Sequence, residues 1–269
     1  MTKLTPKPVT PVSKPYLTGS AADSRTVKAA FGFFGILVLT IFMCFLVSSM
    51  MNLNNDTLRV ILNSAVVLLA LFILFNTASG SGADAVARGE ILYQKQEAGK
   101  PFAASERAMC YHPLKGFLIG FLGTLPLLIC AILLAVTAEK QVTGIGSLPD
   151  WLKNYQRRSE IGDALVAYTA QRGIGLTDIV RMIVRAALLP FVTMVGTENS
   201  GLMLLLERVS PLLTLLPAAA YGIGYMQGKS IRTRVHTGIA EDQKKRARKE
   251  RKERKKRIAA KPKGPEQLN

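Results

Sequence analysis

Long apolar blocks alternate with polar stretches along the chain, and the length of the blocks predicts helices that cross a membrane. The first block covers residues 29–51 and the third covers residues 116–138, and neither carries a charge. A helix rises about 1.5 Å per residue, so each block can cross a hydrocarbon core of about 30 Å. The second block, residues 58–75, follows the first after a short polar turn, which predicts an antiparallel hairpin. Arg59 at its head is expected to reach the interface.

The remaining apolar sequence divides into residues 175–196 and 201–226, and both parts are long enough to span. Asp178, Arg181 and Arg185 recur at spacings of three and four in the first part, so they share one helix face. A charge at the bilayer centre costs about 2.5–3.5 kcal/mol even on lenient scales. We therefore expect residues 176–196 to form an interfacial or re-entrant amphipathic helix with a wet polar face, bent near Pro190, and residues 203–226 to form the last span.

The distribution of lysine and arginine predicts that both ends of the chain are cytoplasmic. Residues 1–28 hold five basic residues against one acid, and residues 229–269 hold sixteen against five. Positive charge near the ends of spans marks the inner side, and two inner ends require an even number of crossings. The alternative is that residues 176–196 form a true span whose arginines face other helices. There would then be five spans, and one end would lie outside.

These observations predict an all-α fold, a multi-pass transmembrane helical bundle of about four spans plus one amphipathic helix. A basic cytoplasmic leader (1–28), a transmembrane domain (29–228) and a polybasic cytoplasmic tail (229–269) follow one another. The Gly/Ser stretch at residues 77–82 predicts a loop, and a short helix should end near Gly99. Gly116, Gly120 and Gly123 predict a close-packing face on the third span, where Pro126 predicts a kink. Residues 150–170 predict short helices on the outer side.

The tail carries much of the charge of the chain. Residues 244–257 hold eleven basic and two acidic residues, a net charge of 11 − 2 = +9 out of +17. Glu250 and Glu253 precede Arg254 and Arg257 by four positions, which favours a solvated helix. The residues expected to contact anionic headgroups or phosphates are Lys244, Lys245, Arg246, Arg248, Lys249, Arg251, Lys252, Arg254, Lys255, Lys256 and Arg257.

The bilayer is the partner that this tail fits best. A basic residue near an anionic leaflet contributes about 1 kcal/mol. Nucleic acid or the ribosome is a second candidate, because phosphates would be neutralised without sequence preference. The run contains no aromatic residue, which disfavours base stacking.

Catalytic and metal-binding patterns are not visible in the sequence. It contains no HExxH and no GxSxG motif. Cys44, Cys110, Cys130, His112 and His236 are too scattered to predict a metal site or a disulfide framework. We therefore expect neither an enzyme nor a cofactor.

Glu207 and Arg208 are adjacent near the start of the last span. An ionisable pair at membrane depth would be a functional site, but adjacent helical residues do not face each other. We expect both at headgroup level.

One short segment has a counterpart in a known family. The segment "LTDIVRMIVRAALLPF" resembles the Arg-bearing span of the membrane insertases, in which a basic, ribosome-facing tail also occurs. In that family a long cytoplasmic hairpin and further spans follow the Arg-bearing span. Too little apolar sequence follows here to supply them, so the resemblance carries no function over.

The sequence thus predicts an integral protein of the plasma membrane without enzymatic activity. The leading interpretation is a scaffold or an accessory subunit of a membrane complex, with another membrane protein as its partner. A small transporter or channel component is the alternative, although no inverted repeat is visible. A ribosome- or nucleic-acid-associated factor acting through the tail is the second alternative.

Overall fold

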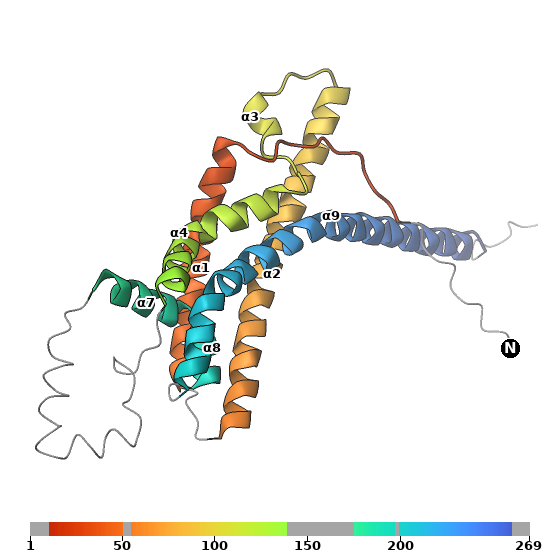
Figure 1. The fold of residues 1–269 in the computed structure, drawn as a ribbon. Helices are drawn as coiled ribbons and strands as arrows, with labels where there is room; N and C mark the ends of the chain where they lie inside the picture. The colour runs from red at the N-terminus through yellow and green to blue at the C-terminus, as the bar shows by residue number, and fades with distance from the viewer. Residues whose placement is uncertain (1–10, 51–54, 139–174, 197–198, 260–269) are drawn as a thin grey trace, which may run out of the picture.

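The computed structural model describes residues 11–50, 55–138, 175–196 and 199–259 (Figure 1). Over these ranges the chain is helical and contains no strand, which confirms the predicted fold class. Four of the described helices are long and apolar enough to cross a bilayer, as expected. The helices are α1 (Ser24–Met50), α2 (Asp56–Glu97), α3 (Ala104–Arg107), α4 (Lys115–Thr137), α7 (Leu176–Ala187), α8 (Leu189–Val195) and α9 (Ser200–Ala259).

Helix α2 corrects the predicted loop at residues 77–82, because it continues without a break through this stretch. It has 42 residues, so it is about 63 Å long, about twice the hydrocarbon thickness. Its first half is the predicted second span, and its second half must extend beyond the membrane. The helix ends at Glu97, followed by Gly99 with φ +67°, close to the predicted end.

The glycines that suggested a loop are helical because α2 crosses α9 very closely. A Cβ added to Gly82 would collide with the carbonyl oxygen of Tyr225, and one added to Gly228 would collide with the backbone of Gly82. Small residues at such a crossing let two helix backbones approach each other. The expected packing face of α4 is confirmed in the same way, since Gly120 lies against Ala218 of α9 and Gly123 lies against α1.

Helices α7 and α8 confirm the expected break near Pro190 and correct the expected orientation. The chain leaves the helical path at Leu188, and Pro190 lies in the first turn of α8. Helix α7 has 12 residues, about 18 Å, which is too short to cross a bilayer. Its charged face is turned into the bundle, with Arg181 buried, while Met182 on its apolar face is 61 % exposed. The expected wet polar face is therefore wrong.

Helix α9 joins the predicted last span and the predicted tail into one element of 60 residues, about 90 Å long. The proposed boundary between residues 228 and 229 falls inside this helix. It contains Pro211 and Pro217, and Figure 1 shows it bent within the bundle before its blue C-terminal part runs away from the other helices. Residues 242–256 are exposed throughout, which confirms the expected solvated helix over this range. We call residues 242–256 the basic arm.

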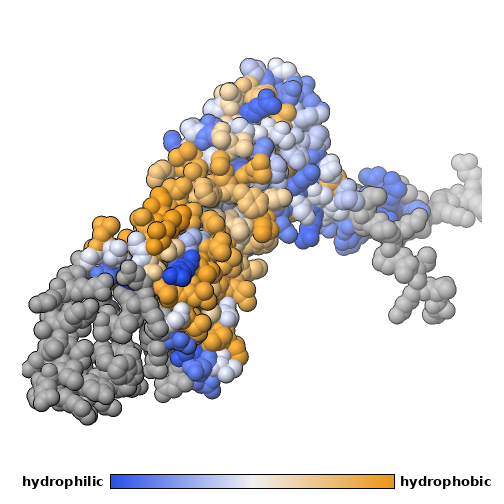
Figure 2. All heavy atoms as spheres, viewed as in Figure 1, coloured by the Kyte–Doolittle hydropathy of each residue, from blue (hydrophilic) through white to orange (hydrophobic). Residues whose placement is uncertain are grey.

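Helix α1 and helix α4 begin at the same end of the bundle at which α2 ends, and we call it the polar end (Figure 1). The described part of the leader is docked there. Leu17 N donates to the carbonyl of Gly89 at 3.1 Å, and Gly19 N donates to the carbonyl of Tyr111 at 3.0 Å. Figure 2 shows a band of apolar side chains over the bundle, with hydrophilic side chains beyond it at the polar end and on the arm.

Candidate functional site

The basic arm carries the predicted tail residues from Lys244 to Lys256 on all sides of an exposed helix, and the side chain of Arg257 lies outside the described residues. Residues 242–256 hold ten basic and three acidic residues, a net charge of 10 − 3 = +7. The ion pair between Lys245 and Asp242, at 3.7 Å, is exposed on both sides and therefore contributes little. The described basic side chains of the arm are thus open to an anionic surface.

A buried ion-pair cluster holds the base of the arm against α2, and we call it the clamp. Arg232 donates from Nε and Nη2 to Oε2 of Glu90, at 3.1 and 3.0 Å. His236 Nε2 lies 2.7 Å from the other oxygen, Oε1 of Glu90. Glu90 and His236 are buried. Because Arg232 and His236 are four residues apart, they share one face of α9 and close on one carboxylate.

The docked leader reinforces the clamp on its other side. Tyr16 contacts Tyr111 edge to face at 6.1 Å between ring centroids, and Tyr111 stacks on Tyr225 of α9 at 5.6 Å. Lys229 Nζ lies 5.7 Å above the ring of Tyr16. Further along α9, Val12 N donates to the hydroxyl of Thr237 at 3.1 Å. The leader therefore crosses from α2 to α9 and ties the two long helices together.

The predicted membrane charges form a second cluster, between α7 and α9. Arg181 Nε and Arg185 Nε donate to Oε1 of Glu207, at 3.0 and 2.9 Å. Arg181 also lies 3.5 Å from Asp178. Glu207 is only 3 % exposed. Two carboxylates and two guanidinium groups give a net charge of zero, which offsets the cost of burying them.

Arg208 is separated from this cluster, because it points away from Glu207 and is exposed. The two adjacent residues therefore have different environments, and the expectation that both lie at headgroup level stays a prediction. Ser210, one turn further on, donates to the carbonyl of Glu207 at 2.7 Å. Val184 and Leu188 pack with Ala131 and Leu134 of α4 beside the ion pairs. The arrangement fits a structural connection between α7 and α9.

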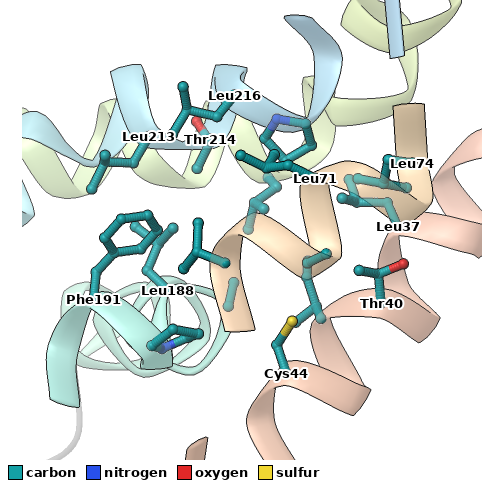
Figure 3. Close-up of a pocket in the computed structure, with 17 residues that line it drawn as sticks. Leu37, Thr40, Cys44, Leu71, Leu74, Leu188, Phe191, Leu213, Thr214 and Leu216 are labelled. Atoms are coloured by element: carbon teal, nitrogen blue, oxygen red, sulfur yellow. The ribbon is translucent and has the colours of Figure 1, made fainter. Parts of the chain in front are cut away.

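An apolar crevice opens between α1, α2, α8 and α9 (Figure 3). Its volume is about 70 Å³, and Leu37, Leu71, Leu188, Phe191 and Leu213 are among the side chains around it. Thr40 and Cys44 lie at its edge in Figure 3, and the lining is otherwise almost wholly apolar. Such a crevice offers few hydrogen-bond partners to a polar solute.

Cys110 and His112 do not form a metal site with other ligands. Within the described ranges no group of three or more His, Cys, Asp or Glu side chains is suitably placed for a metal ion. Cys110 is buried, and this burial raises the pKa of its thiol, while Lys115, Arg107 and Arg88 oppose the rise. The thiol is therefore expected to be protonated and unreactive near neutral pH.

The sequence singled out the arm and the charges of α7, but it missed the clamp. The available signal was the spacing of Arg232 and His236, four residues apart just beyond an apolar run. Their partner, Glu90, lies 142 and 146 residues away along the chain, so spacing alone could not identify it.

Comparison with protein families, with curated proteins and with solved structures gives no significant match for this chain.

Proposed function

We propose that this integral membrane protein is a non-enzymatic scaffold or accessory subunit of a membrane complex. Its bundle holds a partner membrane protein and fixes a basic helix at an anionic membrane surface. The observation that carries the proposal is the continuity of α9, which runs from within the bundle into the basic arm as one helix. Movement of the bundle or of its partner is thereby coupled to the position of the arm.

The clamp supports this function because it restricts the base of the arm. Glu90 engages two successive turns of α9 through Arg232 and His236, and both Glu90 and His236 are buried. A tail that served only to orient the chain in the membrane would not need a fixed direction. The docked leader adds a second attachment to α9 at Thr237.

The membrane surface is the first partner of the arm in this proposal. Figure 1 shows the arm turning aside from the bundle instead of continuing along its length. Such a course favours contact with headgroups, and each basic residue near an anionic leaflet contributes about 1 kcal/mol. By the positive-inside rule, the surface is the cytoplasmic face of the plasma membrane, with both chain ends inside.

A transporter component is the second candidate, and the apolar crevice argues against it. The crevice among the spans is small and nearly without polar lining, so a polar solute would lose its hydration there without replacement. Solute flux through proteoliposomes of the pure protein would support this candidate instead. A ribosome-associated role predicts RNA in the purified material and a strong dependence on salt.

The proposal is tested by purifying three chains in mild detergent under identical conditions. They are the full chain, a chain ending at Glu241, and a full-length variant with Arg248→Gln, Arg251→Gln and Arg254→Gln. The chain ending at Glu241 retains the clamp, so its bundle should fold normally. We expect a stoichiometric membrane protein with all three chains and a reduced amount of anionic lipid with the two altered ones.

The alternatives give different results in the same experiment. If all three chains purify alone, the scaffold proposal is wrong and flux assays follow. If RNA or ribosomal protein accompanies only the full chain, the arm serves the ribosome-associated alternative.

A further inference from the structure

A second basic feature lies at the polar end, apart from the arm. It is a cleft of about 820 Å³ between the start of α1, the second half of α2, the region of α3, the start of α4 and the middle of α9. Four cationic side chains line it, Arg25, Lys28, Arg88 and Lys115. Asp84 is the acidic residue in the lining, so the cleft has a net charge of 4 − 1 = +3.

None of these cations lies within 4.0 Å of a carboxylate among the described residues, although the carboxylate of Asp23 acts electrostatically on Lys115. Burying the charge of Lys115 costs the most free energy among the four, because this side chain is only 6 % exposed. Its ammonium group donates to the carbonyl of Ala108. Arg88 donates to the sulfur of Met109 at 3.1 Å, and sulfur is a weak acceptor. Within the described ranges no ion pair involves any of the four residues. A bound anion would compensate the charge of the buried Lys115, whereas Lys28 and Arg88 are exposed to solvent.

The cleft lies at the start of the apolar blocks of α1 and α4, where lipid headgroups are expected. Lys28 immediately precedes the apolar block of α1, and Lys115 immediately precedes that of α4. The hydroxyls of Ser24, Ser81 and Ser105 lie on the polar side of the lining. Ala29, Ile119, Tyr221 and Tyr225 supply its apolar wall. One ligand would thus meet cations, hydroxyls and apolar side chains together.

We propose that this cleft binds the phosphate-bearing headgroup of an anionic phospholipid. The guanidinium groups of Arg25 and Arg88 and the ammonium groups of Lys28 and Lys115 neutralise the phosphate. The apolar wall receives the glycerol and the first carbons of the acyl chains. Basic pockets between transmembrane helices bind such headgroups. The volume suits a whole headgroup, since ligand sites usually measure about 300–1,000 Å³.

This site does not depend on the proposed function, because it uses none of the residues of the arm. The two features would bind lipid differently. The exposed arm attracts any anionic surface in proportion to charge, whereas the cleft encloses a single headgroup. A lipid held in the cleft should therefore remain bound after the bulk bilayer is removed.

The test uses the full chain in nanodiscs of phosphatidylcholine with a minor fraction of phosphatidylglycerol, and native mass spectrometry counts the retained lipids. The cleft variant carries Arg25→Gln and Arg88→Gln. The matched control carries Lys100→Gln and Arg234→Gln, which removes the same charge from exposed positions outside both the cleft and the arm. We expect one phosphatidylglycerol to be retained by the unaltered chain and by the control. Retention by the cleft variant should fall at least about tenfold, since hydrogen bonds to charged groups are lost.

A third variant separates loss of binding from loss of folding. Asp84→Asn removes the acid from the lining, so we expect stronger retention of phosphatidylglycerol, which a folding defect could not produce. Retention of the two lipids by the unaltered chain in proportion to their shares of the nanodisc would overturn the proposal. So would loss of the bound lipid in the control but not in the cleft variant. Displacement of the lipid by millimolar glycerol 3-phosphate would assign the cleft to a soluble phosphate ester and overturn the lipid assignment.

Discussion

Glu207 is buried between two arginines, Glu90 is buried between an arginine and a histidine, and each carboxylate joins α9 to a different helix. Glu207 connects α9 to α7, and Glu90 connects it to α2. Removing one member of a buried ion pair leaves the other charges uncompensated in a medium of low dielectric constant. Substitution of either carboxylate should therefore lower the free energy of unfolding strongly.

The cluster around Glu207 gives the first prediction. Glu207→Ala leaves Arg181 and Arg185 without their shared acceptor, so it should lower the free energy of unfolding by about 3–5 kcal/mol. Arg208→Ala, at the adjacent exposed position, is the matched control and should change it by less than about 0.5 kcal/mol. Denaturant unfolding of both variants in one detergent measures the difference. Equal stability of the two variants would mean that Glu207 is not paired as described.

Cys110 gives a second prediction at this scale. Burial raises the pKa of its thiol, so the reactive thiolate is scarcer at a given pH than in an exposed cysteine. Because the pKa is raised, alkylation should increase only at a higher pH than for a free thiol. In a chain with Cys44→Ala and Cys130→Ala, we expect slow alkylation at pH 8 and fast alkylation after denaturation. Rapid alkylation of the native chain would contradict the burial of Cys110.

At the scale of elements, hydrophobic periodicity predicted the four long apolar helices and the break near Pro190. It could not predict the direction in which α7 faces. The spacing of Asp178, Arg181 and Arg185 places them on one face. The same spacing would result whether that face meets water or Glu207. The partner lies on α9, and a lone glutamate beside an apolar run fits a headgroup position equally well.

The prediction of a loop at the Gly/Ser stretch of α2 is wrong for a related reason. Glycine weakens a helix by about 1 kcal/mol relative to alanine, so several together indicate a loop. The same residues permit close contact with α9 at Gly228, which recovers more than the propensity costs. Only the matching glycines of the distant helix carry that information.

The helix crossing gives a third prediction, with a control two residues away. A Cβ at Gly82 collides with the backbone of α9, whereas a Cβ at Gly80 meets no atom within 4 Å. Gly82→Ala should therefore destabilise the protein by about 1–3 kcal/mol through overpacking. Gly80→Ala should stabilise it by about 0.5–1 kcal/mol through helix propensity. Thermal unfolding distinguishes the two, and a gain in stability at both positions would exclude the close crossing.

At the scale of the whole molecule, the described start of the chain is docked on α9, where Val12 N donates to the hydroxyl of Thr237. Charge counting predicted from the sequence that both ends are cytoplasmic, and this stays a prediction. It could not predict that the leader and the tail are tied to the bundle, since those contacts join residues far apart in the sequence, such as Val12 with Thr237 and Glu90 with His236.

The orientation in the membrane gives a fourth prediction. In sealed cells, a cysteine introduced by Lys249→Cys in the arm should resist a membrane-impermeant maleimide. One introduced by Asp56→Cys, at the exposed start of α2, should react. Both should react in permeabilised cells. Labelling of the arm in sealed cells would place the basic tail outside and reverse the proposed threading.

The rigid connection between the bundle and the basic arm is most directly tested by a distance measurement. The chain carries spin labels at Gln94 of α2 and Lys249 of α9, and its native cysteines are replaced by alanine. The distance between the two labels is measured in nanodiscs. We predict one narrow distance distribution in this chain and a much broader one when Glu90→Ala removes the acceptor of the clamp. A broad distribution in the chain with Glu90 intact would contradict the account, because the arm would then be a flexible tail.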